Sequence, residues 1–223
     1  AGCGSSKDNG SSSAEKTDTT STPAADSGEN GDDAAPAEDL SGTVTAAGSS
    51  ALKPLADDAA NAFMDKYPDV AITIDAGGSG EGLKQVSDGT VNIGNSDVEA
   101  SEKLDATAAA ELVDHQVCVI TMAPIVNQDV ADAGVTDLSK EELISIFTGE
   151  TKNWSEVGGP DEDIILVTRP SSSGTRATFQ KYALDGNEEA SNASMETDDS
   201  GVLLQNVKDT KGTIGYVALS YLT

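Results

Sequence analysis

The sequence has few residues of the kinds that catalyse reactions or bind metals. It contains 2 cysteines and 1 histidine in 223 residues, and these three do not show the spacing of metal ligands. His115 lies in an apolar segment. No nucleophile stands beside it that it could activate as a base, so we expect a structural or hinge role for it. Neither a nucleophile elbow nor a Walker-type phosphate loop occurs. The sequence therefore predicts no catalytic residues, no metal site and no cofactor.

Positive charge is also scarce. Lysine and arginine number 13 against 39 acidic residues, which gives a formal net charge of -26. Nucleic acid would be repelled by such a chain, and any anion that binds must be captured locally. The acidity is equally well read as an adaptation for solubility or salt. No apolar run reaches the roughly eighteen residues that a membrane-spanning helix needs.

Large apolar residues are almost missing from residues 1–41, which are rich in Gly, Ser, Ala, Thr and acidic residues. This composition predicts a disordered tether. The tether opens with Ala-Gly-Cys-Gly-Ser, which resembles the start of a bacterial lipoprotein, so that Cys3 is the predicted site of lipid attachment. The alternative is an incidental cysteine near a chain terminus. Cys118, within an apolar run, is predicted to be a buried, inert thiol.

After residue 41, short β-branched runs alternate with segments of helical periodicity, a pattern typical of an α/β fold with parallel strands. The apolar run 112–126 is interpreted as strands that cross into a second lobe. Ser139 and Glu142 form a capping box at the start of a helix. The other predicted strands cover 43–47, 70–75, 91–94, 164–168 and 213–217, and the other helices cover 52–67, 80–88, 174–184 and 198–207.

Three loops rich in glycine, serine or threonine lie where a predicted strand ends and a helix begins: 47–51, 77–80 and 171–175. Helix N-termini offer free N–H groups and partial positive charge, and small residues let an anion approach the backbone. Loops of this kind gather at the carboxyl ends of strands in open α/β sheets. Three of them predict an oxyanion site, although each alone could be an ordinary cap or turn.

Two charged residues sharpen this prediction. Arg169, just before the third loop, could offer its planar guanidinium to an oxyanion, whereas Arg176 is expected on the helix surface. Asp97 follows the strand 91–94, and a carboxylate there would accept a hydrogen bond from a protonated phosphate but repel fully ionised sulfate. The alternative for Asp97 is a simple capping role at the end of a strand.

The segments AAGSSALKPL, GGSGEGLKQV, NIGNSD, RPSSSGTRATF and GTIGYV occur in this order between residues 42 and 217. Together they resemble the phosphate-binding proteins of the Pst-type ABC transporter. The resemblance implies a two-lobed periplasmic-binding-protein-like fold of type II, with mixed sheets flanked by helices and the ligand cleft between the lobes. It divides the chain into the tether 1–41, lobe 1 at 42–113 and lobe 2 at 114–223. Family members usually continue further, so the C-terminal part of lobe 1 is expected to be missing.

The resemblance also implies the ligand set. Phosphate is expected to contact Ser50, Ala51, Ser79, Asp97, Arg169, Ser173, Gly174 and Thr175, with Ser49 able to exchange roles with Ser50. The chain would then be an extracytoplasmic, lipid-anchored monomer of the cell membrane that delivers phosphate to an ABC permease and its ATPase. A receptor for sulfate or molybdate is the alternative, followed by an enzyme that acts on phosphoesters.

Overall fold

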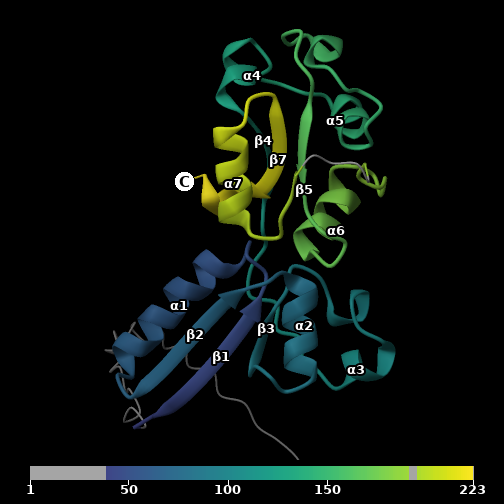
Figure 1. Ribbon diagram of the computed structural model, residues 1–223. Coiled ribbons are helices and arrows are strands. Elements are labelled where there is room, and N and C mark those ends of the chain that lie inside the picture. Colours follow the sequence, from purple (N-terminus) through teal and green to yellow (C-terminus); the bar gives the residue numbers. More distant parts are fainter. Residues whose placement is uncertain (1–38, 191–194, 223) are drawn as a thin grey trace, which may run out of the picture. The chain divides into compact units, whose positions relative to one another are not determined.

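A computed structural model describes residues 39–190 and 195–222 (Figure 1). The predicted tether and Cys3 lie outside the described residues. None of the helices in the described part of the chain is long and apolar enough to cross a membrane.

The first described region is a small parallel α/β unit. Its three strands are β1 (Gly42–Gly48), β2 (Val70–Ala76) and β3 (Ile93–Asn95), in the order β2-β1-β3 with both pairs parallel. Two helices, α1 (Lys53–Lys66) and α2 (Ser79–Ser87), connect consecutive strands. Pro54 stands in the first turn of α1, where its missing N–H costs nothing. The predicted βαβαβ pattern is therefore confirmed, and each helix begins directly after a strand's carboxyl end.

The second region contains a mixed sheet in the order β4-β7-β5-β6, in which β4 runs antiparallel to β7 and the other pairs are parallel. The α/β class with mixed sheets and flanking helices is thus confirmed. The capping box at Ser139 and Glu142 is present. The strands are β4 (Met122–Val126), β5 (Ile165–Thr168), β6 (Met195–Glu196) and β7 (Thr213–Ala218), and the helices are α4 (Gln128–Asp132), α5 (Lys140–Phe147), α6 (Gly174–Tyr182) and α7 (Ser200–Asp209). Short helical turns complete the described elements: η1 (Ala100–Glu102), α3 (Ala106–Ala110), η2 (Trp154–Val157) and η3 (Leu219–Tyr221).

The four-stranded sheet carries the main apolar core. All six residues of its central strand β7 are buried. On it Phe179 stacks against Tyr216, with ring centroids 4.0 Å apart, and Phe147 packs edge-on against both rings. A second buried cluster forms where α7 packs on the sheet, as Figure 1 shows, and consists of Val167, Leu203, Val207 and Val217. Strands β5 and β7, which lead to the candidate site, both contribute buried side chains to this core.

The run 112–126 differs from the prediction. Only Met122–Val126 forms a strand, and residues 113–121 form neither helix nor strand. Strands are stable when paired, and no described strand pairs with residues 113–121. Cys118 is consequently a partly exposed free thiol instead of a buried one. His115 is exposed.

Candidate anion-binding site

The first predicted loop leads from β1 into α1 and is almost completely buried. Ser49 and Ser50 are each 2% exposed, and Ala51 is 4% exposed. The two serine hydroxyls face different partners. Ser49 Oγ donates to Asp97 Oδ1 at 2.5 Å, while Ser50 Oγ donates to the carbonyl of Asp198 at 2.8 Å and lies 2.9 Å from Ser200 Oγ. The loop is therefore fixed by side-chain hydrogen bonds on both sides.

The second loop, Gly77–Gly80, begins α2 and packs tightly against the third loop. Ser79 is 1% exposed, and its hydroxyl accepts a hydrogen bond from the Asp97 amide at 3.0 Å. A methyl group on Gly174 would lie 2.1 Å from Ser79 Oγ, so only glycine fits there. The Gly80 amide also donates to the Ser172 carbonyl at 3.1 Å. The predicted convergence of these two loops is thus seen directly.

Asp97 is the point where hydroxyls from all three loops meet. Besides the bond from Ser49 and its own amide bond to Ser79, its Oδ2 accepts from Thr175 Oγ1 at 2.7 Å. A carboxylate accepts hydrogen bonds only, so Ser49 and Thr175 both present their hydroxyl protons to Asp97, whereas the Ser79 hydroxyl accepts from the Asp97 amide. Asp97 therefore organises the small-residue loops instead of merely capping a turn.

The third loop begins α6, with Ser173 as its N-cap. Ser173 is 1% exposed and Thr175 is 2% exposed, and Ser173 Oγ accepts from the Arg176 amide at 3.3 Å. Gly174 is the first residue of the helix, so its backbone N–H is one of the groups that an α-helix leaves without an internal partner. This helix terminus can bind an anion through its N–H groups and its partial positive charge.

Arg169 is completely buried at the end of β5. Its guanidinium donates to the Asp198 carbonyl at 3.1 Å, to Ser200 Oγ at 3.0 Å and to the Tyr216 carbonyl at 3.2 Å. The Asp198 carboxylate lies 3.7 Å from Nη1, and Arg169 Nε has no hydrogen-bond partner among the described residues. The guanidinium is therefore held in one orientation with some donor capacity left.

A polar cluster of Arg176, Glu189 and Tyr216 lies next to the backbone of Arg169. Arg176, expected on the helix surface, has a side chain only 15% exposed, so that prediction is wrong. It donates to the Arg169 carbonyl at 2.6 Å and lies 3.7 Å from the carboxylate of Glu189. Tyr216 donates its hydroxyl to Glu189 at 2.7 Å. Burial raises the pKa of Glu189 above its ordinary value, and burial next to Glu189 raises the pKa of Tyr216 well above 10.0.

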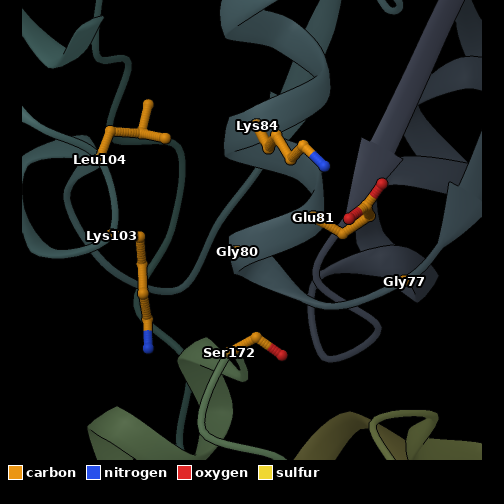
Figure 2. Close-up of a pocket in the computed structure, with 7 residues that line it drawn as sticks. All are labelled: Gly77, Gly80, Glu81, Lys84, Lys103, Leu104 and Ser172. Atoms are coloured by element: carbon orange, nitrogen blue, oxygen red, sulfur yellow. The ribbon is translucent and has the colours of Figure 1, made fainter.

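A pocket of about 420 Å³ opens beside the second and third loops. Figure 2 shows Lys84 and Lys103 on its walls, with Gly80 between them and Ser172 below. Lys103 Nζ donates to the Ser171 carbonyl at 2.9 Å and so ties the segment after η1 to the third loop. Glu81 also lines the pocket, which therefore presents both signs of charge next to the predicted ligand loops.

Sequence reasoning missed Asp198 and Ser200, which lie at the N-terminus of α7 and contact both Ser50 and Arg169. The run Asp-Asp-Ser-Gly at 198–201 was a usable signal, because it has the small and polar residues of the other loops and precedes a helix. The helix was predicted to begin at Asp198, whereas Asp199 is its N-cap and Ser200 its first residue. In the described part of the chain, no group of three or more histidine, cysteine or acidic residues could hold a metal ion.

Comparison with protein families places the chain in a known class. Residues 19–223 match the model of the PBP superfamily domain, and the chain belongs to that superfamily. Within it, the chain is 56% identical over 194 residues to the phosphate-binding protein PstS of Bacillus subtilis, which confirms the resemblance seen in the motifs. That match covers 87% of this chain and 63% of the relative, so the chain spans less than two thirds of the length of that relative.

Solved structures agree. A candidate phosphate ABC transporter substrate-binding protein with bound phosphate, from Clostridium perfringens, matches with a TM-score of 0.70 at 31% identity, covering 82% of this chain and 72% of the other. An ABC-type phosphate transport receptor from Vibrio cholerae matches with a TM-score of 0.56 at 25% identity, covering 79% and 71%. The fold class expected from the sequence is therefore the one these proteins share.

Proposed function

We propose that this chain binds inorganic phosphate and delivers it to an ABC importer as a non-catalytic receptor. The observation that carries the proposal is the meeting of three small-residue loops at Asp97, next to the buried Arg169. Hydroxyls, helix N-terminal amides and one guanidinium supply donors for the oxygens of a phosphate group. The named relatives, which bind or transport phosphate, support the same ligand.

Asp97 gives the proposed site its selectivity. Monohydrogen and dihydrogen phosphate each carry an O–H that can donate to a carboxylate, whereas sulfate at neutral pH carries none. Sulfate would leave the lone pairs of Asp97 facing another anion without a donor between them, at a cost in desolvation and repulsion. The predicted ligand set remains Ser50, Ala51, Ser79, Asp97, Arg169, Ser173, Gly174 and Thr175. Ser49 Oγ donates to Asp97 and Ser50 Oγ donates to the Asp198 carbonyl, so Ser49 keeps its place as the alternative to Ser50 for the phosphate contact.

The location of the receptor is part of the proposal. Its relatives serve ABC transport, which favours an extracytoplasmic position at the cell membrane. In this proposal Cys3 carries the lipid and residues 1–41 form the tether. Lobe 1 follows at 42–113 and lobe 2 at 114–223. We further propose a monomer that presents its loaded form to the permease. Metabolic labelling with a palmitate analogue, compared between the wild type and Cys3→Ala, tests the anchor.

Isothermal titration of the full-length protein with phosphate, and with sulfate as the competing anion, tests the ligand. We expect one phosphate per chain, no displacement by excess sulfate, and a loss of phosphate affinity of about 100-fold or more in Asp97→Asn, which corresponds to the loss of a charged hydrogen-bond partner. Asp65→Asn, an exposed aspartate of α1, is the matched control and should bind as the wild type does. A wild-type protein that binds sulfate as well as phosphate would contradict the proposal.

A further inference from the structure

Asp198 lies where three parts of the proposed anion site meet. Its backbone carbonyl accepts hydrogen bonds from Ser50 Oγ at 2.8 Å and from Arg169 Nη1 at 3.1 Å. Its carboxylate lies 3.7 Å from the same Arg169 nitrogen and is 15% exposed. Asp198 therefore contacts both the first loop and Arg169 at the end of β5, although it belongs to neither.

The second loop is shaped around the same carboxylate. Gly78 has φ of 85°, and a methyl group there would lie 1.7 Å from Asp198 Oδ2. The backbone conformation and the close approach both require glycine at this position. The carboxylate thus reaches across to the turn that begins α2, and it is built into the site instead of lying on the rim.

One oxygen of this carboxylate has no donor. Asp198 Oδ2 is buried and makes no hydrogen bond in the described part of the chain, and the same is true of Arg169 Nε. A buried acceptor without a donor is costly, so this oxygen favours any ligand that brings a proton to it. For the same reason it disfavours a fully ionised anion, which brings only negative charge.

The charge of Asp198 also matters to Arg169 itself. A buried guanidinium without a counter-charge is unfavourable, and Asp198 is the described carboxylate within 4.0 Å of Arg169. With this neighbour, Arg169 offers an incoming anion its hydrogen-bond donors but little net positive charge. Affinity then depends on matched hydrogen bonds more than on attraction between charges.

We propose that Asp198 is a second specificity-determining residue of the site, which neutralises Arg169 and selects, together with Asp97, for oxyanions that carry a proton. This inference rests on the proposed phosphate-binding function and adds a residue to it. The two carboxylates come from different parts of the chain: Asp97 accepts from Thr175 of α6, and Asp198 directly precedes Asp199, the N-cap of α7.

Asp198→Asn tests the inference, because asparagine keeps the size and the backbone carbonyl, removes the negative charge and replaces one acceptor oxygen with an amide donor. We expect sulfate to bind at least about 10-fold more tightly in this variant while phosphate affinity changes less, so that the ratio of the two affinities falls by about 10-fold. Asp199→Asn is the matched control. It removes the same charge one residue away, its side chain is exposed, and asparagine can still cap α7.

The outcomes separate the two proposals. A wild-type protein without phosphate affinity contradicts the proposed function itself. If the wild type binds phosphate but Asp198→Asn keeps the wild-type ratio of affinities, the role of Asp198 is refuted. An equal loss of affinity for both anions also refutes it, because a purely structural support of Arg169 would act on both alike. The same shift in the ratio of affinities in the Asp199→Asn control refutes it as well.

Discussion

The two sheets of this molecule have the same α/β construction but differ in how they are packed. In the four-stranded sheet, β7 is buried along its whole length, and both clusters of buried apolar side chains found in the described chain belong to this region. In the three-stranded sheet, β1 is exposed at its start and buried only over its last three residues. Ile93 on β3 is 49% exposed.

The buried part of the three-stranded region is the part that carries the anion loops. Ser49, Ser50 and Ser79 are at most 2% exposed, and their surroundings include Asp198, Ser200 and Gly174 from the other region. Hydrogen bonds to the four-stranded region thus order these loops, together with the few buried apolar side chains next to them, such as Leu52 and Leu83. The four-stranded region acts as the scaffold, and the loops of the three-stranded region complete the site by hydrogen bonding to it.

Truncation of one phenylalanine in each region should expose this difference most strongly. Phe147 is 0% exposed and packs against two aromatic rings, whereas Phe63 on α1 is 40% exposed. Phe147→Ala should lower the free energy of unfolding by about 3–5 kcal/mol through lost burial and a cavity, and Phe63→Ala by less than about 1 kcal/mol, as for a surface site. Urea unfolding followed by circular dichroism measures both. Equal losses would show that the two regions are packed alike.

Two glycines test how closely the regions fit at the site. Gly78 and Gly89 have similar φ of 85° and 78°, but only Gly78 has a side chain, Asp198, in the space a methyl group would need. Replacement of Gly89 by alanine should cost about 1–2 kcal/mol of stability from its positive φ. Replacement of Gly78 should cost about 1–3 kcal/mol, because its φ of 85° and ψ of 157° lie in a region that essentially only glycine occupies. Gly78→Ala should also lower phosphate affinity by about 10-fold or more, because the overlap pushes Asp198 and Arg169 apart.

Titration calorimetry with phosphate compares the two variants. Gly89→Ala, which meets nothing within 4 Å, should bind phosphate as the wild type does. If Gly78→Ala retains full affinity, the contact between the second loop and Asp198 has no part in binding.

Local patterns in the sequence were sufficient for most of the fold. Alternating β-branched residues predicted β1, β5 and β7, and the capping box predicted the start of α5. These features depend on neighbours in the chain. The run 113–121 has an apolar composition that predicts a strand, but strand formation needs a partner that the composition does not reveal. The short elements α3, α4 and β6 were missed because their periods are too brief to register.

The candidate site likewise has a part that local sequence predicts and a part that depends on contacts between distant residues. Loops next to helix starts could be predicted, because glycine and serine mark them directly. The partners of Arg169 could not, since Asp198, Ser200 and Tyr216 come from distant parts of the chain. Arg176 illustrates the limit: a position near the start of a helix favours exposure, and its tertiary partners, the Arg169 carbonyl and the Glu189 side chain, make a largely buried position favourable.

The smallest expected effect concerns Glu189, a buried carboxyl of the four-stranded region that contacts Tyr216 and Arg176. The charged and titratable groups around it are Tyr216, Arg176, Arg169 and Glu188, and burial outweighs the arginines, so its pKa is raised above 4.5. The folded chain therefore holds this proton more tightly than the unfolded chain does. The carboxyl costs no stability below pH 4.5, and the cost grows as the pH rises from 4.5 through the folded-state pKa.

Glu189→Gln removes this titration while glutamine can still accept the Tyr216 hydrogen bond. The stability of the variant relative to the wild type should therefore rise between pH 4.5 and pH 7, as measured by urea unfolding at both values. Glu188→Gln is the control, since the Glu188 side chain is 84% exposed and should show no such trend. A relative stability that falls over this range would mean that the arginines outweigh burial. Glu189 would then be an ionised partner of Arg176 in the folded chain and not a carboxyl that retains its proton.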